Sequence, residues 1–241
     1  MSAGRVDYFF RDNPLAGLHV RHSLRTRRHM FGQWLAFAHA IGKAQGTVLD
    51  LGTTPDTKWA DSNCMIPWLD EAGFSVSLYS PEDITHLTTV FPRAKVLATG
   101  PDPHAVPVGD RSFDWVVSSA VLEHVGGDTG REAHLSECAR LADGIFLTTP
   151  NRYHWLEFHT KLPLVHWLPK DAHRALLRGI GMQQWAAESH LNLLSHRELR
   201  ALVARVLGDA FESRIVWNWA LGMPSNLVLL AHRKAARNAP V

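Results

Sequence analysis

The chain has 241 residues, of which 46% are hydrophobic and 20% are charged, and its formal net charge is +2. This length suits one sizeable domain with a large core, and the composition is that of an ordinary globular enzyme. The near-neutral charge gives no broad electrostatic case for binding nucleic acid. No apolar run approaches the roughly 20 residues that cross a bilayer, and the first residues, MSAGRVDYFFRDNP, lack the pattern of a signal peptide.

The two cysteines, Cys64 and Cys138, are far apart and form no CxxC pair. We therefore expect a reduced, cytoplasmic protein without structural disulfides. The sequence also contains 15 histidines and 9 tryptophans, which concentrate between His154 and Trp219. It contains no internal repeat and does not indicate an oligomeric state.

A helical segment is expected over residues 1–45. Residues 24–42 place apolar side chains at helical spacing, after the basic stretch RHSLRTRRH at 21–29. We expect this stretch to be the solvated, fraying start of the helix, because no apolar or aromatic stripe accompanies its charges. One alternative stays open, in which the stretch contacts an anionic membrane surface and the protein is a peripheral membrane enzyme.

Short apolar strands and helices then alternate over residues 46–150. Because such strands need cover on both faces, this pattern predicts an α/β fold with a doubly wound, mostly parallel sheet. The fourth strand is expected to open into a helix that starts at LEHV (122–125). Before the fifth strand, REAHLSECARLA is amphipathic and predicts a helix. The predicted strands are TVLDL (47–51), SVSLYS (75–80), AKVLA (94–98), FDWVVSSAV (113–121) and GIFLTTP (144–150).

The remaining sequence predicts a lid and the end of the sheet. Residues 151–194 are rich in histidine and tryptophan and are expected to form a helical lid. The letters SHRE at 195–198 are a capping box that starts a helix ending near 207. Residues 195–232 would return to the core with two further strands, ESRIVWNW and SNLVLLAH, and residues 233–241 would be a frayed tail.

Polar side chains follow all five strands of the first half. In a parallel sheet, ligands bind beyond the carboxyl ends of the strands, so these side chains are expected to share one site. Any one acid would more often be a helix cap or a turn residue, whereas polar residues at five successive strand ends favour a binding site. They are Asp50, Gly52, Thr53 and Thr54 after the first strand, Glu82 and Asp83 after the second, Asp102 after the third, Ser118 and Ser119 in the fourth, and Thr148, Thr149, Asn151 and Arg152 at the fifth.

Two of these segments resemble a known family. AVPVGDRSFDWVVSSAVLEHV resembles the corresponding segment of class I S-adenosylmethionine-dependent methyltransferases, and GIFLTTPNR is similar to the subgroup containing quinone-biosynthesis and small-molecule O-methyltransferases. The resemblance covers roughly residues 46–152. It implies a seven-stranded Rossmann-like methyltransferase fold and S-adenosylmethionine as the cofactor. Glu82 would accept the ribose hydroxyls and Asp102 the adenine amino group. The residues expected to bind the cofactor are Asp50, Gly52, Thr53, Thr54, Glu82, Asp102 and Ser119.

The turn after the first strand departs from the family. Its usual GxGxG pattern lets backbone approach the methionine part of the cofactor, but only Gly52 matches here, and Thr53, Thr54, Pro55 and Asp56 follow. Either the loop takes another path, with threonine hydroxyls binding the cofactor carboxylate, or the site has decayed and the chain is an inactive partner protein. We favour the altered loop, because decay would also have eroded the acids of the next two strands.

The lid is expected to bind the methyl acceptor. A hydroxyl acceptor must lose its proton near the transition state, and interleaved aromatic and polar residues suit a hydroxylated ring or sugar. We predict O-methylation of a small molecule or a glycan precursor, with N- or C-methylation as the alternative. The candidate bases are His154, which we rank first, His159 and His124, although each histidine could instead be held by backbone partners. The expected acceptor-binding residues are Asn151, Arg152, Tyr153, Trp155 and Glu157.

A metal has weaker support in the sequence. HWLEFH at 154–159 matches neither HExxH nor HxxEH, and no cysteines stand at zinc-ligand spacing. We therefore assign no metal ligand from the sequence. Mg²⁺ bridging the acceptor and a carboxylate stays open.

Overall fold

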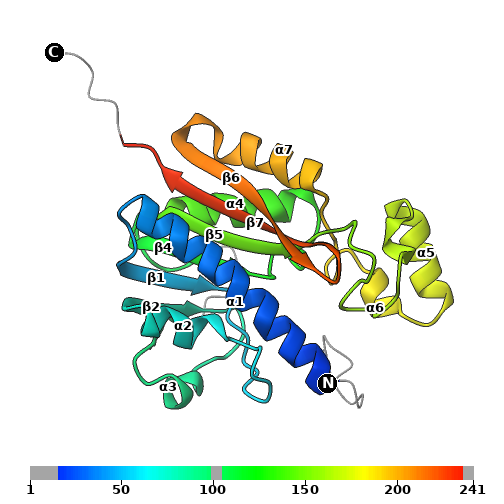
Figure 1. Cartoon of the computed structure of the whole chain (residues 1–241), viewed down its shortest axis with the longest axis horizontal. Coiled ribbons are helices and arrows are strands. Elements are labelled where there is room, and N and C mark those ends of the chain that lie inside the picture. The colour runs from blue at the N-terminus through cyan, green and yellow to red at the C-terminus, as the bar shows by residue number, and fades with distance from the viewer. Residues whose placement is uncertain (1–15, 99–104, 236–241) are drawn as a thin grey trace.

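A seven-stranded sheet forms the centre of the computed structural model, which describes residues 16–98 and 105–235 (Figure 1). The strand order is β3-β2-β1-β4-β5-β7-β6. Neighbouring strands from β3 to β5 are parallel, and β7 is antiparallel to both β5 and β6. The predicted doubly wound, mostly parallel sheet is therefore confirmed. The strands are β1 (Gly46–Leu51), β2 (Phe74–Tyr79), β3 (Lys95–Val96), β4 (Phe113–Ser119), β5 (Ala142–Pro150), β6 (Phe211–Ala220) and β7 (Met223–Arg233).

Helices cover both faces of the sheet, and a group of short helices lies beyond one end (Figure 1). Within the described ranges, none of these helices combines the length and apolar character that a bilayer span requires. The helices are α1 (Ala16–Ala40), α2 (Met65–Glu71), α3 (Leu87–Val90), α4 (Asp128–Leu141), η1 (Val165–Trp167), α5 (Lys170–Gly179), α6 (Gln183–Ala186), α7 (His196–Val206) and η2 (Gly208–Ala210).

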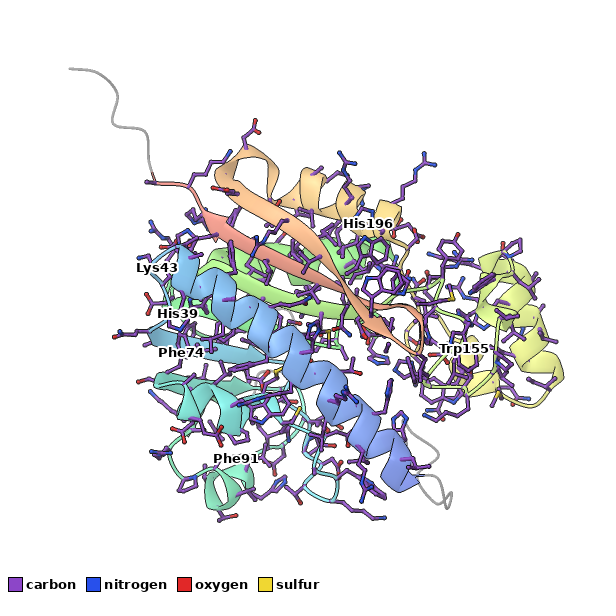
Figure 2. The ribbon with its side chains drawn as sticks, viewed as in Figure 1. His39, Lys43, Phe74, Phe91, Trp155 and His196 are labelled. Atoms are coloured by element: carbon purple, nitrogen blue, oxygen red, sulfur yellow. The ribbon has the colours of Figure 1, made fainter. Side chains whose placement is uncertain are left out.

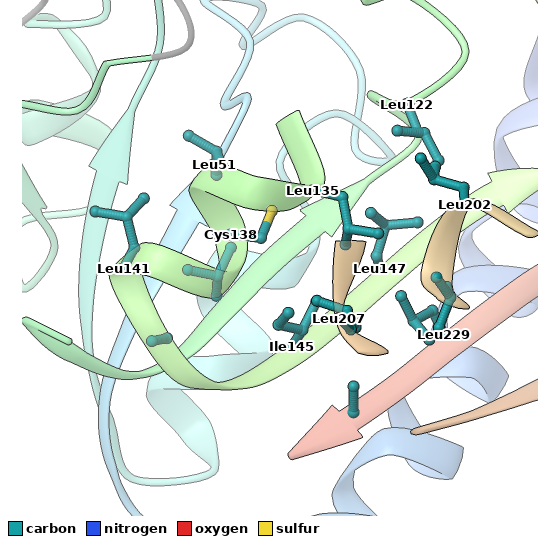
Figure 3. Close-up of a cluster of buried hydrophobic side chains, with 14 of the residues drawn as sticks. Leu51, Leu122, Leu135, Cys138, Leu141, Ile145, Leu147, Leu202, Leu207 and Leu229 are labelled. Atoms are coloured by element: carbon teal, nitrogen blue, oxygen red, sulfur yellow. The ribbon is translucent and has the colours of Figure 1, made fainter. Parts of the chain in front are cut away.

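The sheet separates two hydrophobic cores, because successive side chains of a strand point to opposite faces. Helices α1 and α2 pack on one face, where Trp34 stacks on Phe146 with 5.4 Å between ring centroids and meets Trp115 edge-on. Helices α4 and α7 pack on the other face against leucines such as Leu49 and Leu147 (Figure 3). Both cores hold the strand ends rigidly in place.

Helix α1 differs from its prediction. It already includes Ala16, so the basic stretch 21–29 lies within the helix and the expectation that it forms the helix start is wrong, although Arg21, Arg25 and Arg28 are exposed as expected. Its side chains reach other parts of the chain: His22 stacks on Phe158 of the lid, and the His29 Nδ1 lies 2.6 Å from the Asn218 Oδ1. The spacing of apolar residues could not predict these contacts, because the polar side chains of His22 and His29 make them.

The segment after β4 also differs. The LEHV letters were expected to start a helix, but residues 120–127 form turns and α4 begins only at Asp128. Ala120 and Gly126 have positive φ angles of 59° and 86°, which no α-helix accommodates. The turn leaves Glu123 and His124 at the carboxyl edge of the sheet.

The lid, residues 151–194, contains η1, α5 and α6 and extends from the end of β5 (Figure 1). It has a small core of its own, in which Leu177, Trp185 and Leu191 are buried. The capping box that ends it is confirmed, because the Glu198 amide donates to the Ser195 hydroxyl and the Ser195 amide donates to the Glu198 carboxylate. At the far end of the sheet, β7 extends one residue into the expected tail.

Candidate functional site

Asp50 and Gly52 lie side by side at the carboxyl end of β1. The Asp50 side chain is buried among the strand ends, and this burial raises its pKa from 3.8 to about 7. Gly52 has a φ of +101°, and a Cβ there would lie 2.5 Å from a methyl group of Val121. Its amide donates to the Tyr79 carbonyl of β2. The backbone therefore needs glycine at this position, as the sequence predicts.

An asparagine holds the unusual turn that follows. The Asn63 side chain accepts a hydrogen bond from the Thr54 amide at 3.1 Å and donates to the Thr54 carbonyl at 2.7 Å and the Asp56 carbonyl at 3.2 Å. The Thr53 hydroxyl donates to the Asp50 carbonyl. Side-chain hydrogen bonds thus order this loop. The Thr53 hydroxyl, which we expected to bind the cofactor carboxylate, instead donates to the backbone at the end of β1.

The end of β2 presents two acids in different roles. The Asp83 carboxylate accepts hydrogen bonds from the amide and hydroxyl of Thr85, which lower its pKa. The Glu82 side chain is exposed at the same edge of the sheet as Asp50.

Ser119, at the end of β4, lies with its hydroxyl 3.2 Å from the Thr148 hydroxyl. Asp102, the acid expected after β3, lies outside the described residues.

Arg27 brings a positive charge to this edge. Its electrostatic influence lowers the pKa values of Asp50 and Glu123 and opposes the rise that burial causes in each. It acts on the Cys64 thiol in the same way. Arg27 on α1 therefore influences both the end of β1 and the turn after β4, where the sequence interpretation expected only solvated charges.

Glu123, His124 and His159 meet on the other side of this edge. One potential ligand atom from each lies within 4.8 Å of the others. The two imidazole rings are nearly perpendicular, with centroids 5.1 Å apart, and the His124 Nε2 lies 3.9 Å from the Glu123 Oε1. Two of the three predicted bases are therefore brought together, and they share a buried carboxylate that the prediction omitted.

Each member of this cluster is fixed by a further contact. The Glu123 Oε2 accepts a hydrogen bond from the Thr149 hydroxyl at 3.0 Å, and burial raises the pKa of this carboxyl. The His124 Nδ1 lies 2.6 Å from the His190 carbonyl, and burial together with His159 lowers the pKa of His124 to about 3. Its ring is therefore neutral, with Nδ1 as the donor.

The Glu157 carboxylate orients His159. The His159 Nδ1 and the Glu157 Oε1 are 2.7 Å apart, and both residues are buried. Burial acts to raise the pKa of Glu157, but His159 and the amides of His159 and Thr160 hold it at about 2. Burial acts in the opposite sense on His159, yet Glu157 keeps its pKa above the ordinary value. Glu157, expected to bind the acceptor, is thus already committed to His159.

His154, ranked first as a base, lies in a different setting. Its Nδ1 lies 2.9 Å from the Leu156 carbonyl and 3.3 Å from the Leu156 amide, and its Nε2 lies 3.2 Å from the Ala220 carbonyl. Backbone groups thus contact both ring nitrogens, and the ring stacks on Phe158. This geometry ties the lid to the β6–β7 hairpin and leaves His154 apart from the other two histidines.

The remaining lid candidates divide in the same way. Asn151 is buried and bonds to the backbone of Pro224, and the Arg152 guanidinium donates to the carbonyls of His166 and Leu168. The Trp155 indole donates to the Leu221 carbonyl, and Figure 2 shows this tryptophan at the border between hairpin and lid. Tyr153 is 48% exposed. These residues build and border the lid rather than converge on the cluster.

No family model and no curated protein matches this sequence. Solved structures do match, at low identity. One is the magnesium protoporphyrin IX methyltransferase of Synechocystis PCC 6803 with bound S-adenosylhomocysteine: TM-score 0.53, 15% identity, 96% of this chain and 90% of that one. A second is a SAM-dependent methyltransferase from Aquifex aeolicus, with a TM-score of 0.51 and 12% identity over 78% of this chain and 82% of that one. A third, described as a Zn-dependent alcohol dehydrogenase from Rhodobacter sphaeroides, scores 0.53 at 12% identity over 79% and 84%.

The chain has the class I methyltransferase fold. In a doubly wound sheet of this kind the ligand crevice lies at the carboxyl ends of the strands. Asp50, Gly52 and Glu82 stand at these ends, with the Glu123 turn beside them. The likeness concerns the fold alone, so the chemistry must be argued from the side chains.

Three residues of this candidate site escaped the sequence interpretation. Glu123 stands directly before His124, and its strand-end position was a usable signal. Arg27 lies in a stretch whose helical phase, not its charge, decides which side chain faces the sheet. Asn63 gave no signal, because its contact with the Thr54 loop depends on its positive φ of 56° and on folding.

Proposed function

We propose that this chain is an S-adenosylmethionine-dependent methyltransferase that methylates a hydroxyl group of a small molecule or a glycan precursor. The observation that carries the proposal is the pairing, at one edge of a class I sheet, of the Asp50–Gly52 turn with a buried cluster of proton acceptors. Methyl transfer needs both parts: one to hold a charged cofactor and one to receive the proton of the hydroxyl.

The groups at the ends of β1 and β2 fit the cofactor chemically. S-adenosylmethionine carries an ammonium and a carboxylate at one end and ribose hydroxyls in the middle. Asp50 would bind the ammonium and Arg27 the carboxylate, while the exposed Glu82 would accept the ribose hydroxyls. When bound, the cofactor supplies an electrophilic methyl group. In this assignment Arg27, and not the hydroxyls of Thr53 and Thr54, binds the cofactor carboxylate, because these hydroxyls make hydrogen bonds within the loop.

The cluster fits a hydroxyl acceptor. Glu123 Oε1 and His124 Nε2 are proton-accepting atoms 3.9 Å apart in a buried setting. A hydroxyl placed against them would be oriented and would lose its proton to them as the methyl is transferred, a contribution of about 10²–10⁴-fold in typical enzymes. Carbon or amine acceptors stay alternatives to be tested.

The decisive experiment for the cofactor is a titration of the full chain with S-adenosylhomocysteine by calorimetry and thermal melting. A ligand that binds only the folded state raises the melting temperature in proportion to the logarithm of its concentration. We expect a dose-dependent rise. Flat melting curves up to millimolar ligand, with the protein folded, would show that the Thr-Thr-Pro-Asp loop marks a lost site.

The acceptor is tested next, with radiolabelled S-adenosylmethionine and a panel of phenols, sugars, amines and carbon acids. Transfer to hydroxyl compounds alone would support the proposal. Transfer only to amines or carbon acids would retain the methyltransferase and refute the hydroxyl assignment.

A further inference from the structure

We propose that Glu123, His124 and His159 form a binding site for a divalent transition-metal cation, with Zn²⁺ as the preferred ion. The binding itself follows from these three side chains. Its use, which is to bind and acidify the acceptor hydroxyl, rests on the proposed methyltransferase function.

The geometry is close to that of a three-ligand site. The potential ligand atoms lie within 4.8 Å of one another, and the Glu123 Oε1 to His124 Nε2 distance is 3.9 Å. In a tetrahedral zinc site, ligand atoms at 2.0–2.2 Å from the ion lie about 3.3 Å apart. The ligand atoms would therefore have to approach one another by at most about 1.5 Å to reach this spacing.

Both histidines are oriented as metal ligands usually are. A ligating imidazole typically donates its other nitrogen to a carboxylate or a backbone carbonyl, which fixes its tautomer and orientation. Here the His159 Nδ1 is 2.7 Å from the Glu157 Oε1, and the His124 Nδ1 is 2.6 Å from the His190 carbonyl. In each case Nε2 is the nitrogen that would take the ion.

The carboxylate supplies an independent observation. Glu123 is fully buried, and among the described residues its Oε1 has no hydrogen-bond partner, while its Oε2 is held by the Thr149 hydroxyl. Leaving a buried carboxylate oxygen without a partner is costly, and a cation at the cluster would remove that cost. The unpartnered atom is the one that lies nearest to His124.

The donor set selects the kind of ion. Two imidazole nitrogens and one carboxylate oxygen suit zinc and similar transition metals, whereas Mg²⁺ and Ca²⁺ prefer oxygen ligands. Three protein ligands leave a coordination position for a hydroxyl or water, as in catalytic zinc sites. The rival explanation needs no metal: the positive charges of His159 and Arg27 would neutralise Glu123.

The test uses the full chain stripped of metal with a chelator. Zn²⁺ is titrated by competition with a chromophoric chelator, and Co²⁺ is added separately for its visible absorption, which reports nitrogen and oxygen ligands in low coordination. We expect one tight site for each chain. Because the sequence has 15 histidines, weak binding elsewhere is expected and stoichiometry alone is insufficient.

The variants Glu123→Gln, His124→Gln and His159→Gln provide the assignment. Each should weaken Zn²⁺ binding by about 100-fold or more, since even outer partners of metal ligands are typically worth 10–100-fold. The control is His166→Gln, a buried lid histidine outside the cluster, which should bind Zn²⁺ as the wild type does. Circular dichroism establishes that each variant is folded.

Two results would overturn the site: a wild-type chain without a stoichiometric Zn²⁺ or Co²⁺ site, or tight binding that persists in the cluster variants. If Glu123→Gln does not fold, the two histidine variants and the Co²⁺ spectrum decide. The cofactor titration separates this proposal from the enzymatic one. Bound S-adenosylhomocysteine without a metal site refutes only the metal, and a metal site without cofactor binding supports the metal and refutes the methyltransferase.

Discussion

At the ends of β1 and β2, the strands themselves determine where the site residues lie, whereas in the lid side-chain hydrogen bonds determine it. Asp50 and Gly52 occupy their places because β1 lies between β2 and β4. His159 occupies its place because Glu157 holds its ring, and His154 because the Leu156 and Ala220 backbone holds it. In the first region the strand order places Asp50 and Gly52, while in the second individual polar contacts place each histidine.

This difference teaches how the two regions should respond to substitution. Under the proposed function, the side chains at the ends of β1 and β2 would face the cofactor, so their removal should lower affinity and leave the fold intact. The lid contains a histidine that we expect to stabilise the fold, His154, and one that we expect to act in the reaction, His159. Substituting the first should lower stability, and substituting the second should lower turnover. The four predictions below test that division, from the largest expected effect to the smallest.

The largest effect is expected for the cluster histidines. His124→Gln and His159→Gln should lower turnover by about 10²–10⁴-fold, because they remove a proton acceptor or a metal ligand used only in the reaction. Affinity for S-adenosylhomocysteine should stay unchanged, as measured by calorimetry.

His154→Gln is the matched comparison within the lid. It should lower the melting temperature and leave the per-molecule turnover of the folded fraction near that of the wild type, because its ring nitrogens bind backbone groups. If this variant alone loses turnover while folded, His154 is the base and the division within the lid fails.

The second effect concerns Asp50 and pH. Its folded pKa of about 7 exceeds the ordinary 3.8, so the unfolded chain releases this proton first, and stability falls as the pH rises from about 4 to 7. The shift corresponds to about 4 kcal/mol at most. Asp50→Asn should abolish this part of the pH dependence and be more stable than the wild type at pH 8 without ligand. Urea denaturation between pH 4 and 8 measures it; parallel curves for the two proteins would show that Asp50 titrates normally.

The third effect is on cofactor affinity. Glu82→Ala and Arg27→Ala should each weaken S-adenosylhomocysteine binding by about 1.5–3 kcal/mol, the scale of hydrogen bonds to charged groups. Asp83→Ala and Arg25→Ala are the controls, because Asp83 bonds to Thr85 and Arg25 is exposed on α1. A loss at Asp83 instead of Glu82 would shift the assignment at β2 by one residue.

The smallest effect comes from a position in neither region. Ser195→Ala removes the hydroxyl that caps α7 and should lower the free energy of unfolding by about 1 kcal/mol. Affinities for S-adenosylhomocysteine and Zn²⁺ should not change. This variant supplies the reference for a purely structural loss. A change in either affinity would mean that α7 is coupled to the site.

The sequence by itself determined the sheet and placed Asp50, Gly52 and Glu82 at its carboxyl edge. A short apolar strand that ends in a polar turn is readable in one dimension, because burial on both faces requires an unbroken apolar run and the run must stop where the chain leaves the sheet. The capping box at Ser195 is equally local, since its partners are three residues apart.

Only the tertiary structure decided which polar side chains act together. Arg27 influences the pKa of Asp50 because α1 packs on the sheet, and His124 meets His159 because the turn after β4 faces a loop 35 residues further along the chain. Nothing local distinguishes His154 from His159, since both follow the same strand among the same aromatics. Their roles differ because the Ala220 carbonyl contacts His154, whereas His159 meets Glu123 and His124, and these partners become neighbours only when the chain folds.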